Sequence, residues 1–348
     1  MKMLEHPFAR LQAAWASNPE LLVVFLYTLL RGSLHCFSGL SNTPRTSNKF
    51  SIIMGESKGG NVNMQLDRYL RLLSKHRQSP ALAWVGFLLL SLVVWKLVSD
   101  GDFSFIMTYG AFARTFGFGL LAVKLWTARS ATGVSFKTLQ LYALVFFFRL
   151  TSIIPFSGYL PYDKSGDWFY HFVESLSLFL VLVSMYLVKV RFPHSYDERT
   201  DSFGNLHVPA SFGALVYLAV PCLALAVLFH PGLNSHFLAD TTWAFSMYLE
   251  SVAMLPQLYM FQKQSSQVVE VLIGHWVFAS GFARVLDMIF WMSSYHELVD
   301  HSGSKMVGVF VLLTQFIHII LMVDFFYYYL ISVRSGLPLQ LPRAGGLV

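Results

Sequence analysis

The sequence has few charged residues for its length. Asp, Glu, Lys and Arg make up 13% of its 348 residues, whereas about 25% is usual in a soluble domain. Hydrophobic residues make up 55% of the chain, so the surface of the fold must be largely apolar. These proportions predict a protein that is embedded in membrane lipid.

The chain also has little of what other protein classes need. Its two cysteines, Cys36 and Cys222, are far apart and imply no disulfide framework. The sequence contains no nucleophile-base pair, cluster of metal ligands or phosphate loop, so we expect neither an enzyme nor a metal or cofactor site. The net charge of +6 is more typical of basic cytosolic loops than of nucleic acid binding.

Long apolar segments predict an all-α polytopic fold. A spanning helix needs about 20 residues. The first such segment, 81–99, follows an N-terminal extension over 1–80, which we expect to be partly disordered and basic near its end. Seven more helices are expected in a core over 103–334, followed by a short cytosolic tail over 335–348. The seven ranges are 105–126, 135–154, 168–189, 208–229, 239–261, 269–292 and 306–331.

Basic residues set the expected orientation of these helices. If the first of the seven begins in the lumen, the lumenal side collects only Lys164 and Lys305, and the cytosolic side collects eight basic residues. Cytosolic loops of membrane proteins are enriched in Lys and Arg, which favours this orientation. The eight cytosolic residues are Arg129, Lys137, Lys189, Arg191, Arg199, Lys263, Arg334 and Arg343.

One carboxylate lies near the middle of an expected span. Trp243, Glu250 and Gln257 are seven residues apart, so they share one face of a continuous helix over 239–261. An ionised carboxylate that faces lipid costs several kcal/mol, so this face is expected to point into the protein. Glu250 either forms a structural hydrogen bond to a neighbouring helix or borders a buried polar site.

Two arginines are expected in the lumenal half of the core. Arg149 lies late in a helix that rises toward the lumen, and Arg284 shares a face with Asp287 and Trp291. Arginine binds carboxylates through two parallel hydrogen bonds, which suits a pocket for a C-terminal carboxylate. The alternative is structural: Arg284 pairs with Asp287, and Arg149 pairs with Glu174 or Glu250. The expected ligand-binding residues are Arg149, Arg284, Trp243, Trp291, Asp240, Asp287 and Glu250.

Three sequence motifs resemble the KDEL receptors, which are seven-helix proteins that return escaped residents to the endoplasmic reticulum. The first is W-A-F-S-M-Y-L-E-S-V-A-M-L-P-Q-L over 243–258. The loops A-R-S-A-T-G-V-S over 128–135 and Y-D-E-R-T-D-S-F over 196–203 are also similar to family loops. Loop sequences are not dictated by packing, so they support the resemblance independently.

The resemblance implies a fold, a function and a set of partners. The fold is two three-helix bundles around a linking helix, as in the SWEET and PQ-loop families, with 81–99 as one added helix. The function is to bind C-terminal retention signals, K-D-E-L or H-D-E-L, for retrieval from Golgi to endoplasmic reticulum. The implied cytosolic partners are the COPI coat and small-GTPase regulators. Asp324, in D-F-F-Y-Y-Y, corresponds to the aspartate of the family's transport switch.

Several positions depart from the family pattern. Arg114 stands at the family's histidine, so acid-gated binding is in question because arginine stays charged. His171, His275 or His318 could replace that histidine. Two arginines are lost, a carboxylate is gained, and the tail lacks the lysines that engage COPI. The substitutions at ligand positions are Met107, Leu150, Ser152, Asp287, Phe290 and Ser294, which together indicate a divergent, receptor-like member.

Two other functions remain compatible with the sequence. Pro256-Gln257 resembles the PQ-loop and SWEET families, which would make the protein a small-solute transporter. Such a transporter should carry a matching proline hinge in its first bundle, and Pro155 lies too near a helix end to provide one. The substitutions also permit a membrane scaffold that has lost ligand binding; if the protein is a receptor, they permit altered cargo.

Overall fold

The computed structural model describes residues 84–97, 105–160, 167–205, 213–264, 268–296 and 305–341. The expected extension over 1–80 and the end of the tail lie outside these ranges. The described part is all-α, as predicted. Its helices are Trp84–Leu97, α5 (Phe105–Ala128), α6 (Phe136–Ile153), α7 (Asp167–Tyr186), α8 (Val220–Leu228), α9 (Phe237–Val252), α10 (Leu255–Lys263), α11 (Val271–Ser293) and α13 (Lys305–Ser335).

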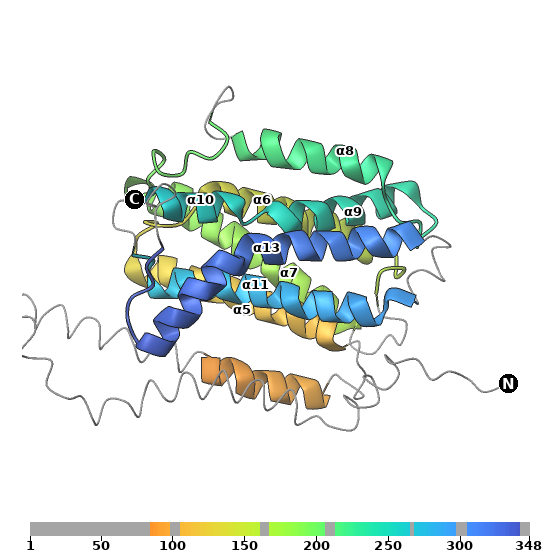
Figure 1. Ribbon diagram of the computed structural model, residues 1–348, viewed down its shortest axis with the longest axis horizontal. Coiled ribbons are helices and arrows are strands. Elements are labelled where there is room, and N and C mark those ends of the chain that lie inside the picture. Colours follow the sequence, from red (N-terminus) through yellow and green to blue (C-terminus); the bar gives the residue numbers. More distant parts are fainter. Residues whose placement is uncertain are drawn as a thin grey trace, which may run out of the picture.

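The helices pack in two groups of three. In the first group α7 packs against both α5 and α6, and in the second α13 packs against both α9 and α11. The groups meet where α5 packs on α11 and α6 packs on α9. Helix α8 packs on α9 and lies along the outside of the bundle (Figure 1).

Four described helices are long and apolar enough to cross a membrane: Phe105–Ala128, Asp167–Arg191, Val271–Ser293 and Gly308–Ser335. The second of these spans consists of α7 and the π-helical turn Leu187–Arg191 that continues it. The segment Leu215–Leu228 is apolar but shorter, and its first turn is also π-helical. Helix α6 has only 18 residues and includes Lys137 and Arg149, which lower its mean hydropathy.

The helix expected over 239–261 is broken. Helix α9 ends at Val252, Ala253 and Met254 form a turn, and α10 begins at Leu255. Pro256 explains the break, because its ring would clash with the carbonyl four residues earlier and it has no N–H to donate. The expectation of one continuous helical face through Trp243 and Gln257 is therefore wrong.

Gln257 instead holds the loop between α5 and α6. Its Oε1 accepts a hydrogen bond from the Ser135 N–H at 2.8 Å, and its Nε2 donates to the Gly133 carbonyl at 2.8 Å. The Ser135 hydroxyl donates to Asp201 at 2.7 Å. The hydroxyl of Tyr196 also donates to Asp201, and burial with this carboxylate nearby raises the pKa of Tyr196. The two loops with family motifs thus meet at one end of the bundle.

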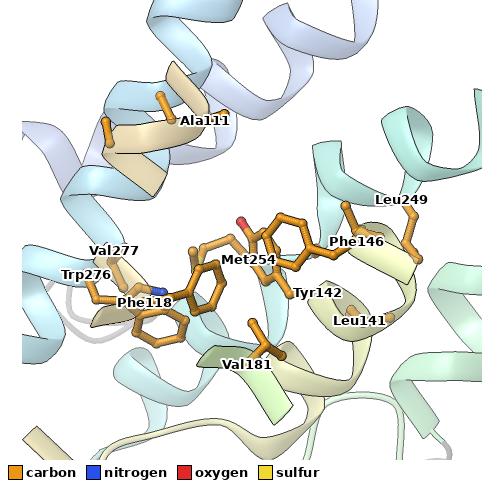
Figure 2. Packing of buried hydrophobic residues seen from close by; sticks show 14 of the residues in the cluster. Ala111, Phe118, Leu141, Tyr142, Phe146, Val181, Leu249, Met254, Trp276 and Val277 are labelled. Atoms are coloured by element: carbon orange, nitrogen blue, oxygen red, sulfur yellow. The ribbon is translucent and has the colours of Figure 1, made fainter. Parts of the chain in front are cut away.

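The hydrophobic core centres on aromatic rings between α5, α6 and α11 (Figure 2). The ring of Phe118 contacts those of Tyr142, Phe146 and Trp276 at centroid distances of 5.1, 5.6 and 5.7 Å. The guanidinium of Arg114 lies 5.2 Å from the Phe146 centroid. This aromatic packing therefore holds α5, α6 and α11 together next to the buried charge of Arg114.

The helix Trp84–Leu97 packs on the outside of α5 and α11, on the side away from α8 in Figure 1. The rings of Trp84 and Phe116 are 5.1 Å apart, and Phe87 stacks on Phe116 at 4.5 Å. The Trp84 indole donates a hydrogen bond of 3.2 Å to His275, which also contacts the Tyr329 hydroxyl at 2.6 Å. The added helix is therefore fixed to the core by both aromatic and polar contacts.

Candidate ligand-binding site

Glu250 is the centre of a buried network of charges. It lies on α9, is 0% exposed, and forms ion pairs with three arginines from three different helices. Arg114 of α5 approaches it at 2.5 Å, and Arg149 of α6 and Arg284 of α11 pair with it as well. Glu250 therefore points into the protein, as expected for a carboxylate that would be costly to expose to lipid.

Two further carboxylates complete the network. Glu174 of α7 is 0% exposed and pairs with Arg114 and, at 3.3 Å, with Arg149. Asp287 lies one turn after Arg284 on α11 and pairs with it at 3.3 Å. The formal charges of these three arginines and three carboxylates cancel. Both structural alternatives raised by the sequence, the pairing of Arg149 and the pairing of Arg284, are therefore present.

A small recess opens beside this network. It has a volume of about 30 Å³, roughly the space of one water molecule. Arg149 and Arg284 line it together with two tryptophans, Trp243 and Trp291, whose rings meet edge to face at 5.8 Å. The full lining is Met107, Arg149, Tyr170, Trp243, Met247, Arg284, Asp287, Trp291 and Gln315.

The recess lies at one end of the bundle. Most of its residues lie toward the start of α5, α7, α9 and α13 or toward the end of α6 and α11. Tyr159, in the loop between α6 and α7, stacks on Trp243 at a centroid distance of 3.9 Å. Aromatic rings thus line the recess beside the buried arginines, and the low dielectric of such surroundings strengthens any charge-assisted hydrogen bond made there.

Known proteins resemble this chain over about two thirds of its length. Residues 130–294 match a family model described as ER lumen protein retaining receptor. An ER lumen protein-retaining receptor of Drosophila melanogaster is 32% identical over 234 residues, which is 67% of this chain and 96% of that protein. ER lumen protein-retaining receptor A of Arabidopsis thaliana is 32% identical over 224 residues, 64% of this chain and 92% of the relative.

The chain belongs to the ER lumen protein-retaining receptor family. This confirms the resemblance to KDEL receptors that the three motifs indicated. It also confirms two further predictions: the family is one of receptors rather than enzymes, and the protein is a multi-pass membrane protein. The family model leaves the N-terminal extension unmatched.

Asp240 does not line the recess, although the sequence analysis expected it among the ligand-binding residues. Its carboxylate accepts hydrogen bonds from the Tyr159 hydroxyl at 2.7 Å and from the N–H groups of Asn234 and His236 at 3.1 and 3.2 Å. A carboxylate in the first turn of a helix stabilises the exposed N–H groups and the helix dipole. Burial and the bond to Asp240 raise the pKa of Tyr159, so its hydroxyl stays protonated.

Two other predicted residues lie away from the lining of the recess. Arg114 is 1% exposed and sits behind the recess, where it joins Glu174 to Glu250. Asp324 of α13 is exposed, as is the preceding Val323, whereas the following Phe325 is buried.

Sequence reasoning missed several polar members of the site. Gln315 of α13 accepts a 3.1 Å hydrogen bond from Arg284, and His318 contacts the Glu250 carbonyl at 2.9 Å. The sequence indicated His318 only as a replacement for the family's histidine and Glu174 only as a partner of Arg149, and it did not indicate Tyr170. Intramembrane polar residues face the protein interior as a rule, so their positions in apolar helices were the signal that could have found them.

Proposed function

We propose that this protein is a receptor for C-terminal peptide tails of lumenal proteins, acting in the endoplasmic reticulum and Golgi membranes to return those proteins to the endoplasmic reticulum. The observation that carries the proposal is the position of Arg149 and Arg284 side by side in the lining of a recess walled by Trp243 and Trp291. A terminal carboxylate fits two guanidinium groups because each can donate two parallel hydrogen bonds.

The distribution of charge supports a lumenal position for the recess. The opposite end of the bundle carries Arg129, Lys189, Arg191, Arg199 and Lys263, and basic residues favour the cytosolic side. The recess end would then face the lumen, where the tails of resident proteins are found. The cytosolic end would meet the COPI coat and small-GTPase regulators.

Binding requires the recess to open. A volume of about 30 Å³ admits water but no peptide, so Trp243 and Trp291 must separate before a tail can enter. The incoming carboxylate would take over hydrogen bonds that Arg149 and Arg284 now make to Glu250, Glu174 and Asp287. Ligand binding would therefore rearrange the ion pairs that hold the two helix groups together.

Such a rearrangement can reach the cytosolic side through α13. Gln315 contacts Arg284, and His318 contacts the backbone of Glu250, so α13 touches the network twice. Asp324 lies further along the same helix. A shift of α13 on ligand binding would move Asp324, which is how a lumenal tail could alter a cytosolic sorting surface.

A transporter similar to the SWEET and PQ-loop families is less well supported. The break between α9 and α10 is one hinge of the kind such proteins need. Helix α6, its counterpart in the first group, runs unbroken to Ile153, and Pro155 follows its end. The hinge therefore has no partner in α6.

The first experiment measures tail binding at two pH values. We expect purified full-length protein to bind fluorescent peptides ending in K-D-E-L or H-D-E-L. For K-D-E-L, which carries no histidine, the affinities at about pH 5.5 and pH 7.2 should agree within about threefold. The reason is that Arg114, which faces Glu174 and Glu250, stays charged throughout this range. Absence of binding at both pH values would leave a receptor with altered cargo, a transporter or a scaffold as the remaining functions.

A histidine at position 114 should introduce pH dependence. In Arg114→His the ring must be protonated to pair with Glu174 and Glu250, so binding should weaken at least about tenfold between pH 5.5 and pH 7.2. Arg114→Lys is the matched control, because lysine stays charged at both values. Equal pH profiles for the His and Lys variants would show that this position does not control binding.

A further inference from the structure

Asp287 places a negative charge directly in the recess. Its side chain lines the cavity, is 11% exposed, and lies 3.3 Å from the guanidinium of Arg284. The neighbouring helix makes room for it at Gly110, where a Cβ atom would come within 2.7 Å of the Asp287 carboxylate. The carboxylate therefore occupies a defined place between α5 and α11.

Asp287 changes what the two arginines can offer to a ligand. Arg284 already faces Glu250 and Asp287 and donates to Gln315, and Arg149 already pairs with Glu174 and Glu250. Because the formal charges of the network cancel, it does not attract a strongly negative ligand. A tail with acidic side chains next to its terminal carboxylate would add several negative charges to a poorly solvated, neutral site.

The rest of the lining adds no compensating cation. Met107 and Met247 are apolar, Tyr170 and Gln315 are uncharged, and the two tryptophans complete the wall. The Nε–H of Arg284 is buried and has no hydrogen-bond partner among the described residues, so it can donate to a new acceptor. The recess thus matches one carboxylate, together with a group that can donate to Asp287.

We propose that the recess selects tails with a single carboxylate at the C-terminus and a cationic or hydrogen-bond-donating side chain just before it, and that Asp287 is the residue that determines this preference. The inference rests on the proposed function, since it assigns a class of ligand to the same recess. Asp287 would receive the donor of the ligand, while Arg149 and Arg284 would receive the carboxylate.

The test compares three tails on the full-length protein in detergent. Fluorescent peptides that end in K-D-E-L, K-N-Q-L and K-N-K-L differ in side-chain charge but share the lysine, the final leucine and the free carboxylate. We expect the neutral and cationic tails to bind at least about tenfold more tightly than K-D-E-L. In Asp287→Asn the ratio should fall to about threefold or less. Glu198→Gln removes one exposed carboxylate far from the recess and should leave the ratio unchanged.

The outcomes separate this inference from the function on which it rests. A ratio that falls in Asp287→Asn but not in Glu198→Gln supports the assignment. Binding of K-D-E-L as tight as that of K-N-K-L, or a ratio that Asp287→Asn does not change, overturns the role of Asp287 and leaves tail binding intact. Failure of all three tails to bind any of the proteins overturns the proposed function itself. Thermal unfolding of each variant shows that the protein is folded when binding is measured.

Discussion

Replacing Glu250 with alanine should lower the free energy of unfolding by about 3–5 kcal/mol, which is typical for removal of one partner from a buried ion pair. Glu250 pairs with Arg114, Arg149 and Arg284, so its loss leaves three buried guanidinium groups facing only Glu174 and Asp287. The melting temperature of the purified protein, followed by tryptophan fluorescence, measures the effect.

Two further variants sharpen this measurement. Glu198→Ala removes an exposed carboxylate and should change stability by no more than about 0.5 kcal/mol. Glu250→Gln combined with Arg114→Met removes one charge of each sign and should be more stable than Glu250→Gln alone, because fewer cations then lack a partner. If Glu250→Ala has the same melting temperature as the Glu198→Ala control, the network does not hold the helices together.

Replacing Arg149 or Arg284 with lysine should weaken tail binding by about 10–100-fold while the protein stays folded. Lysine preserves the charge that Glu174, Glu250 and Asp287 require, but it cannot donate two parallel hydrogen bonds to one carboxylate. A charge-assisted hydrogen bond contributes about 1.5–3 kcal/mol, which gives the expected range. Peptide titration followed by fluorescence anisotropy measures the change.

The control for this pair is Arg199→Lys, since Arg199 is exposed in the loop between α7 and α8. It should bind tails as the unmodified protein does. If either lysine variant in the recess also binds normally, the guanidinium groups serve only the internal network and the ligand does not touch them.

The sequence predicted an all-α fold with several membrane-spanning helices, because long apolar runs report membrane burial with little help from tertiary contacts. It failed where a local effect overrides that pattern. Pro256 divides the expected helix over 239–261 into α9 and α10. A hydropathy profile averages over such a break and therefore does not detect it.

The sequence also indicated which charges lie inside the protein and suggested pairings for Arg149 and Arg284, but it did not indicate that Arg114 joins Glu174 to Glu250. Glu250, Arg149 and Arg284 were expected to be buried, since lipid does not tolerate them. The pairing of Glu250 with Arg114 and of Arg149 with Glu174 depends on how four helices rotate against one another, which spacing within one helix does not specify. Asp240 shares a face with Trp243, yet it binds the loop before its helix rather than the recess.

The measurement that tests the account most directly compares a tail that has a free C-terminal carboxylate with the same tail ending in a carboxamide. Peptides ending in K-D-E-L and K-N-Q-L are used in both forms, with full-length protein. Capture of the carboxylate by Arg149 and Arg284 predicts that amidation weakens binding at least about thirtyfold, since loss of one partner of a buried charge pair costs 2–5 kcal/mol or more. Amidated and free tails that bind within about threefold of each other would contradict carboxylate capture in this recess.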